Sequence, residues 1–252
     1  MCGRYASAKD PATLAAEFDA VDAMGDQAPD LDYNVAPTKN VVAVVQRHPR
    51  AEDGTVDDST TERTLRVMKW GLVPAWSKDA SGGARMINAR SESAAEKPAF
   101  KKSLAQRRCL IPADGWYEWR RDRSAKQPFY TTTRDGSSLA MAGLWTTWRD
   151  KTDPAAPVLI TCAVLTTDAV GPIAEIHDRM PLLLGRDAWP GWLDPDATEV
   201  AELLAPPSWD IVDALEIRPV SRAVNSVRNN GPELLAPLAT DLDQAEPDLF
   251  EA

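Results

Sequence analysis

The residue with the clearest chemical potential is Cys2, because it directly follows the initiator methionine. Removal of Met1 would leave Cys2 with a free α-amine and a thiol, whose reference pKa values are about 7.7–8.0 and about 8.5. Both groups are then partly nucleophilic near neutral pH. An aldehyde can form an imine with the amine, after which the sulfur closes a five-membered thiazolidine ring. Because one residue carries both nucleophiles, ring closure avoids the entropy cost of a second encounter.

The residues after Cys2 support a ligand near the N-terminus. Gly3 would let the backbone approach a ligand closely, and the guanidinium of Arg4 could hold an anion. Taken alone, Cys2 is more typical of an incidental buried cysteine. The rest of the chain has to decide between the two interpretations.

A second group of chemical residues is the segment Met86–Glu92. Asn88 and Arg90 alternate in it, so on an extended chain they share one face. An amide and a guanidinium on one face can bind a phosphate or orient a nucleophile. The alternative is an ordinary strand end.

A glutamate and a histidine are the candidates for proton transfer. Glu118 stands between aromatic residues in Trp116–Trp119, and apolar surroundings would raise its pKa. His177, in Ile176–Pro181, can titrate near neutrality and suits general acid–base catalysis. The alternatives are a solvent-facing Glu118 and a packed loop histidine. The other histidine, His48, is interpreted as incidental.

Tryptophans in loops are candidates for stacking on nucleobases. Trp70 and Trp76 flank a Gly–Pro loop, and Asn34 lies in the polar segment Tyr33–Thr38. Stacking is worth roughly 1–3 kcal/mol per base. The alternative is core packing, which fits most of the nine tryptophans.

The elements that must position these residues are mainly strands. Asp10 and Pro11 predict a helix start, and a further helix is expected from Pro98 to about Gln106. We expect loops at 21–30 and 51–64, a turn at 33–38, and short helices at 91–96, 170–176, 188–193 and 197–204. Strands are expected at 41–45, 65–70, 109–113, 116–120, 129–132, 139–145, 158–165 and 180–184 and within 211–220. Because most strands follow one another without crossover helices, the pattern predicts an α+β domain on a curved, mostly antiparallel, barrel-like sheet with peripheral helices.

Composition limits the function further. The 252 residues carry a formal net charge of −10, which disfavours non-specific binding to nucleic acid. Residues 90–134 nevertheless hold eleven basic and five acidic side chains, so a basic face is possible. The three cysteines favour a reducing, cytoplasmic location over a disulfide framework. No signal peptide, membrane span or metal-ligand spacing is recognised, and we expect no cofactor.

Seven motifs, in this order, resemble the SRAP family of abasic-site processing proteins. They are Met1–Tyr5, Tyr33–Pro37, Trp70–Pro74, Ile87–Arg90, Asp114–Trp119, His177–Pro181 and Pro219–Ser221. The resemblance implies an SRAP-like domain over residues 2–238, followed by an acidic tail at 239–252. The acidic segment 51–64 is the main departure from the family pattern.

The resemblance also implies a role for each matching residue. Cys2 would link covalently to the ring-opened aldehyde of an abasic site in single-stranded DNA, with Asn88 positioning it, after autocatalytic removal of Met1. Glu118 would be the catalytic glutamate, and His177 would assist formation and reversal of the Schiff base, a lyase-type chemistry. The DNA-binding residues implied are Arg4, Asn34, Trp70, Arg90, Thr166 and Arg179.

The expected partner is single-stranded DNA with abasic sites, including sites at single-strand/duplex junctions, bound by a monomer that engages the nucleoid and no membrane. Two other classes of function remain open. An N-terminal-nucleophile peptidase or amidohydrolase would also use Cys2, Asn88 and His177. A non-catalytic single-strand binding module would leave Cys2 without a chemical role.

Overall fold

A computed structural model describes residues 2–51, 53–121 and 126–238 of the chain. Within these residues the α-helices are α1 (Pro11–Phe18), α2 (Pro98–Gln106), α3 (Trp189–Leu193) and α4 (Trp209–Asp213). The strands are β1 (Tyr5–Ser7), β2 (Val21–Asp22), β3 (Asp32–Val35), β4 (Asn40–Arg47), β5 (Glu62–Trp70), β6 (Asn88–Arg90), β7 (Arg108–Ala113), β8 (Gly115–Arg121), β9 (Lys126–Thr133), β10 (Leu139–Trp148), β11 (Leu159–Asp168), β12 (Arg179–Pro181) and β13 (Leu215–Pro219). Short 3-10 turns, η1 to η8, join several of them.

The smaller sheet carries the N-terminus. Its strand order is β13-β9-β8-β1-β3, and all of its pairings are antiparallel. β1 therefore lies between β3 and β8, with Tyr5 opposite Val35 on one side and Trp116 on the other. The N-terminal residues consequently run beside β8, the strand that holds Glu118.

The larger sheet curls until its hydrogen bonds close a ring. Its order is β12-β11-β10-β7-β4-β5-β2, and β5 pairs additionally with β11 in parallel. Only two residue pairs, Thr161 with Lys69 and Cys162 with Trp70, make that closing contact, so the sheet is curled rather than a complete barrel. β6 adds in parallel to the other end of β11.

Both faces of the larger sheet are buried. In β4, Val42 and Val44 point into a core shared with helices α1, α2 and α3, which we call the helix-side core. Val41 and Val45 point into a second core that contains Cys2 and Tyr5, the N-terminal core. Successive residues of a strand face opposite sides, so an unbroken apolar run fits a strand that is buried on both faces.

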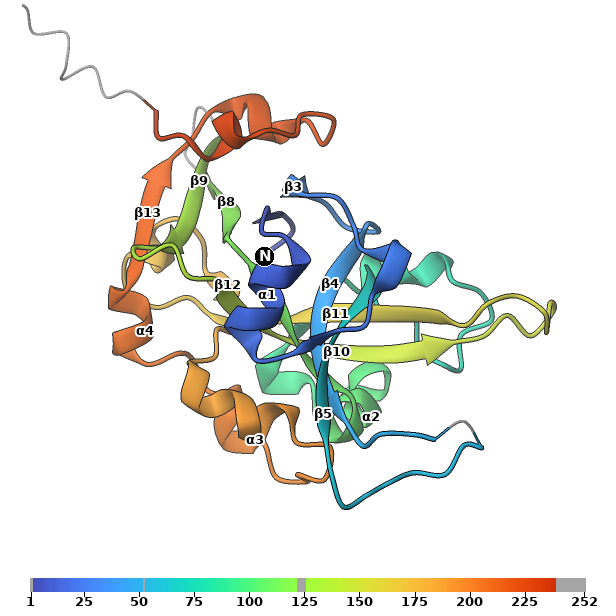
Figure 1. The fold of residues 1–252 in the computed structure, drawn as a ribbon. Helices are drawn as coiled ribbons and strands as arrows, with labels where there is room; N and C mark the ends of the chain where they lie inside the picture. Colours follow the sequence, from blue (N-terminus) through green and yellow to red (C-terminus); the bar gives the residue numbers. More distant parts are fainter. Residues whose placement is uncertain (1, 52, 122–125, 239–252) are drawn as a thin grey trace, which may run out of the picture.

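Helices α1, α2 and α3 cover the first of these cores (Figure 1). α1 begins where Asp10 accepts a hydrogen bond from the Thr13 amide at 3.0 Å, with proline at the first helical position. Its buried Phe18 stacks on Trp189, 4.7 Å between ring centroids. Figure 1 shows the N-terminus near the centre of the molecule, while the C-terminal segment crosses one side beside β3, β8 and β9.

The expected fold class is confirmed: the described residues form one mixed α+β domain with a curled, mainly antiparallel sheet and peripheral helices. Several details differ from expectation. The predicted turn at Tyr33–Thr38 begins as strand β3, and the predicted loop at 21–30 contains strand β2. Only Ala201–Leu204 of the expected helix at 197–204 is helical, as a 3-10 turn.

The acidic segment at 51–64 lies in the connection between β4 and β5. Strand β5 already starts at Glu62, earlier than expected, and pairs with Arg47. Residues 53–61 are all exposed. The predicted acidic tail at 239–252 lies outside the described residues.

Candidate active site

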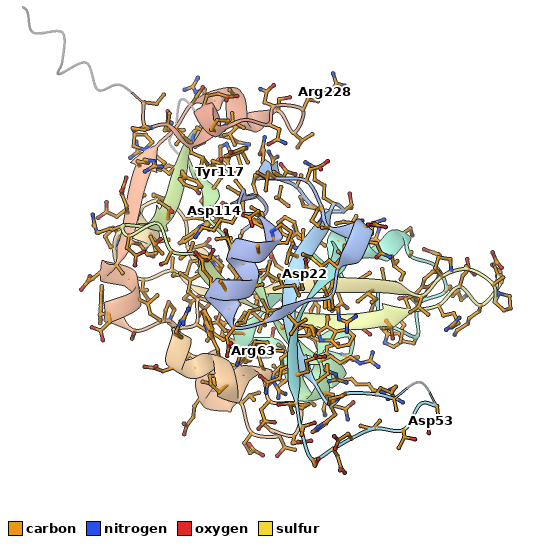
Figure 2. The ribbon with its side chains drawn as sticks, in the orientation of Figure 1. Asp22, Asp53, Arg63, Asp114, Tyr117 and Arg228 are labelled. Atoms are coloured by element: carbon orange, nitrogen blue, oxygen red, sulfur yellow. The ribbon has the colours of Figure 1, made fainter. Side chains whose placement is uncertain are left out.

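The N-terminal residues are held in place by hydrogen bonds from three directions. The Tyr117 amide of β8 donates to the Arg4 carbonyl at 2.9 Å, and the Ala8 amide donates to Asp114 Oδ2 at 2.5 Å. On the far side, Asn88 Nδ2 donates to the Cys2 carbonyl at 2.8 Å. Figure 2 shows Tyr117 and Asp114 beside the N-terminal segment. This hydrogen bond joins Asn88 to the backbone of Cys2, and the positioning role expected of Asn88 stays a prediction.

Asn88 reaches Cys2 because the chain turns back sharply after β5. Gly71 has φ +127°, and a Cβ there would lie 2.7 Å from the Gly83 carbonyl oxygen, so only glycine fits. The Leu72 amide donates to the Met86 carbonyl at 3.0 Å, which brings the returning segment beside β5. β6 then pairs with β11, with Asn88 opposite Val164.

The thiol of Cys2 is completely buried, with 0% exposure. Burial raises its pKa to about 12, and the nearby negative charge of Glu118 adds to the rise. The thiol is therefore neutral at physiological pH. A sulfur in this state is a weak nucleophile until a base removes its proton.

Glu118 and His177 form a buried acid–base pair. Glu118 Oε1 lies 3.8 Å from His177 Nε2, and the two residues are 7% and 8% exposed. The other ring nitrogen, Nδ1, lies 3.0 Å from the Arg179 amide and 2.7 Å from Asp178 Oδ1. Without a proton, Nδ1 accepts from the amide; with one, it can donate to the carboxylate. The imidazole thus has a partner in either protonation state, which suits a group that gains and loses protons.

Arg4 is half-buried and fixed rather than mobile. Its Nη1 donates to Asn34 Oδ1 at 2.7 Å and to the Val224 carbonyl at 2.9 Å. Its guanidinium carbon lies 5.8 Å from the centroid of the Trp119 ring. Burial lowers the pKa of Arg4 from its ordinary value, although the group remains cationic.

Three residues expected to line a DNA path are buried instead: Asn34, Trp70 and Thr166. The Trp70 indole N–H donates to the Ile87 carbonyl at 2.9 Å, and the ring packs edge-on against Tyr5 at 5.3 Å. In this structure it cannot stack on a base. Trp76, six residues later, is 65% exposed and does offer a free ring face.

The remaining two predicted residues differ in accessibility. Arg90 is exposed at the end of β6. Arg179 is buried, and its guanidinium donates to Glu92 at 2.8 and 3.0 Å, to Asp168 at 2.5 Å and to the Thr166 carbonyl at 2.7 Å. The hydrogen bonds to Glu92 are the main cause that raises the pKa of Arg179. Its charge is thus largely compensated within the protein.

The structure therefore brings Cys2, Asn88, Glu118 and His177 together from four separate segments. Sequence reasoning missed Asp178, Glu92 and Asp168 as partners of this site. Asp178 and Glu92 lie inside motifs that the sequence analysis singled out. Asp168 is the last residue of strand β11 and belongs to no recognised motif.

The basic stretch at 90–134 does not form a single element. Its residues are distributed over β6, α2, β7, β8 and β9. Arg108 is buried and donates to five backbone carbonyls, which belong to Leu104, Ala105, Trp192, Asp194 and Ala197. The charge of Arg108 therefore serves the fold and does not contribute to an exposed basic face.

Two general features of the described part of the chain bear on its function. Its helices are too short or too polar to cross a bilayer. Its histidine, cysteine, aspartate and glutamate side chains form no group of three or more that could hold a metal ion.

Comparisons with known proteins agree with the resemblance found in the sequence. A family model described as SOS response associated peptidase (SRAP) matches residues 1–227. The abasic site processing protein YoaM of Bacillus subtilis (strain 168) is 38% identical over 241 residues, which cover 93% of this chain and 97% of YoaM. The abasic site processing protein YedK of Escherichia coli (strain K12) is 32% identical over 246 residues, which cover 94% of this chain and 100% of YedK. A crystal structure of a Bacteroides thetaiotaomicron protein superposes with a TM-score of 0.78 at 22% identity, covering 94% of this chain and 100% of that one, which supports the fold.

Proposed function

The chain belongs to the SOS response associated peptidase (SRAP) family, and from this premise we propose that it captures abasic sites in single-stranded DNA as a covalent adduct on Cys2. The observation that carries the proposal is the convergence on Cys2 of an amide, Asn88, and a carboxylate–imidazole pair, Glu118 and His177. An abasic site exposes an aldehyde when its sugar ring opens, and a 1,2-aminothiol is a selective trap for an aldehyde.

Met1 must leave before this chemistry can start, because the α-amine of Cys2 is otherwise part of the peptide bond to Met1. We infer that the chain removes Met1 itself by hydrolysis of that bond. The Asn88 hydrogen bond to the Cys2 carbonyl would keep the new N-terminus in place.

The amine then attacks the aldehyde carbon and forms a carbinolamine. Because the thiol pKa is raised to about 12, the amine is the better first nucleophile. His177 donates a proton to the carbinolamine oxygen, which departs as water, and it takes back the proton that the nitrogen loses as the imine forms.

Ring closure consumes the sulfur. Glu118 removes the thiol proton, the sulfur adds to the imine carbon, and the imine nitrogen takes up a proton to complete the thiazolidine. Overall, aldehyde and aminothiol give the ring and one water. The 3.8 Å separation of Glu118 from His177 lets a proton pass between them after a small movement or through one water.

Single-stranded DNA fits this site better than intact duplex. The reacting residues are buried, so the sugar must leave a base stack to reach them, and a missing base makes that movement inexpensive. A net charge of −10 also works against broad attraction to duplex DNA. We therefore expect binding by a monomer at single strands or at single-strand/duplex junctions.

The test is incubation with a single-stranded oligonucleotide that carries one abasic site, followed by denaturing electrophoresis and intact-mass measurement. We expect a conjugate whose mass is that of the chain without Met1 plus the oligonucleotide minus one water. An intact oligonucleotide of the same sequence is the control and should give no conjugate. Binding without a conjugate would favour the non-catalytic module. Loss of Met1 with neither binding nor conjugate would favour the N-terminal-nucleophile peptidase or amidohydrolase.

A further inference from the structure

The segment Arg222–Asn230, which we call the C-terminal loop, lies beside the candidate active site and has no role in the chemistry above. It contains the 3-10 turn η7 (Arg222–Asn225) and leads to η8 (Pro232–Leu235). Val224 is its buried anchor, whereas Val227 is 49% exposed and Arg228 is exposed beside it. The loop carries two arginines and no carboxylate on a chain whose net charge is −10.

The loop is fastened to strand β3 by side-chain amides. Asn34 Nδ2 donates to the carbonyls of Val224, Ser226 and Asn229, at 3.3, 3.0 and 2.9 Å. The Tyr33 amide donates to Asn230 Oδ1 at 2.8 Å. Within the loop, Asn229 Nδ2 donates to the Ala223 carbonyl at 2.8 Å. A contact made by a loop held in this way costs little additional ordering entropy.

The same loop is joined to the N-terminal segment that contains Cys2 and to strand β8, which contains Glu118. The Val224 carbonyl also accepts from Arg4, two residues from Cys2, at 2.9 Å. Asn225 Oδ1 accepts from the Trp119 indole N–H at 2.7 Å, and Trp119 is adjacent to Glu118. Figure 2 shows Arg228 at the outer rim, on the same side of the molecule as Tyr117.

The exposed side chains have the chemistry of a nucleic-acid contact. An accessible guanidinium suits a phosphate, and an apolar side chain beside it suits the face of a sugar or base. Neither carboxylate that flanks the loop pairs with Arg228: Asp32, on strand β3, is paired with Lys39 at 2.5 Å, and the Glu233 carboxylate lies against Gly231.

We propose that the C-terminal loop is a second wall of the DNA site, in which Arg228 binds a backbone phosphate that flanks the lesion and Val227 packs on the adjacent nucleoside. The proposal rests on the proposed function, because that function supplies the DNA strand. It adds a contact outside the reacting residues, one that governs how firmly the strand is held.

Binding without chemistry tests the loop. The probe is a fluorescent single-stranded oligonucleotide with one tetrahydrofuran residue, which lacks the aldehyde, and anisotropy gives Kd at several salt concentrations. Arg228→Gln should raise Kd about fivefold and reduce the salt slope by about 0.7, the value for one phosphate of a single strand. Val227→Ser should raise Kd about threefold and leave the salt slope unchanged.

Lys102→Gln is the matched control, because it removes one exposed charge from α2, far from the loop in Figure 1. It should behave like the parent protein. Equal effects of Arg228→Gln and Lys102→Gln, or a parental Kd and salt slope for Arg228→Gln, would overturn the proposal. A loop that binds a protein partner instead of DNA would give one of these two results.

A second readout separates this proposal from the proposed function. With a true abasic site, the DNA concentration that gives half-maximal conjugate should rise about fivefold in Arg228→Gln, in step with its Kd. If the parent binds the tetrahydrofuran probe but forms no conjugate, the covalent chemistry is wrong and the loop can still be judged by its Kd. If Arg228→Gln slows conjugate formation at saturation, the assignment of Arg228 to binding alone is overturned.

Discussion

Replacement of Asn34 by alanine tests how the site is organised. The sequence predicts Asn34 as a DNA-binding residue, whereas the structure buries it completely between Arg4 and the C-terminal loop. Its side-chain oxygen accepts from Arg4, and its amide nitrogen donates to three loop carbonyls. If this side chain acts by holding its neighbours, Asn34→Ala should lower stability and DNA affinity together.

The magnitude follows from which partners remain satisfied. The Val224 carbonyl keeps its hydrogen bond from Arg4, and the carbonyls of Ser226 and Asn229 lie in exposed residues that water can reach. The loss is therefore about two ordinary hydrogen bonds, at about 1 kcal/mol each, and one charge-assisted bond of about 1.5–3 kcal/mol. The total is roughly 4 kcal/mol, which corresponds to a fall in Tm of about 8–16 °C for a chain of this size.

The assay combines thermal unfolding with anisotropy on the tetrahydrofuran oligonucleotide. A double-mutant cycle with Arg4→Gln should give a coupling free energy of about 1 kcal/mol or more, since the two residues share a hydrogen bond. Asn34→Ala with an unchanged Tm and a higher Kd would refute the reasoning, and would identify Asn34 as a direct DNA contact. If the effects of Asn34→Ala and Arg4→Gln on the free energy of unfolding were additive, the two residues would not be coupled, and the reasoning would again be refuted.

Three further outcomes are expected. Glu118→Gln and His177→Ala should each slow formation or reversal of the conjugate by about 10²–10⁴-fold without unfolding the protein, as measured by single-turnover electrophoresis and circular dichroism; parental rates in both would remove them from the chemistry. Cys2→Ser, once processed, should give an imine that borohydride traps but no stable conjugate, and chains that retain Met1 should give neither; intact mass decides this, and a stable adduct on a Met1-retaining chain would exclude the aminothiol mechanism. Burial raises the pKa of Cys162 from 9.0 to about 12, so its contribution to stability is complete below about pH 9 and falls as pH rises towards about 12. Urea unfolding should show this alkaline loss, and Cys162→Ala should flatten it; an unchanged slope would assign the loss to other groups.

Most of the larger sheet could be predicted because its strands are buried on both faces. Runs such as Val41–Val45 are apolar without interruption, which is unusual for any exposed element. β3 was missed for the opposite reason. It starts with the polar residues Asp32, Tyr33 and Asn34, and it is a strand because it pairs with β1, a contact that the local sequence does not encode. Helix α4 was missed because it has five residues and exposes Trp209.

In the candidate site, the sequence allowed residues with suitable chemistry to be selected. It did not predict which of their side chains are exposed to solvent. Cys2, Asn88 and His177 were singled out by their residue types together with the resemblance of their motifs to the SRAP family, and their roles stay predictions. Trp70 was expected to face DNA because it borders a loop. It is buried because the Tyr5 ring and the Ile87 carbonyl meet it there, and both come from distant parts of the chain.

Arg179 shows what this difference means for DNA binding. Its guanidinium is held by Glu92, Asp168 and the Thr166 carbonyl, while its amide donates to His177 Nδ1. A phosphate that binds Arg179 would have to displace the carboxylates of Glu92 and Asp168 from the guanidinium. If both carboxylates stayed in place, their negative charges would repel the phosphate. The arrangement instead fixes the backbone at 179, and with it the orientation of the imidazole that moves protons. The phosphate-binding charge is then expected from cations that face solvent, such as Arg90 at the end of β6 and Arg228 on the C-terminal loop.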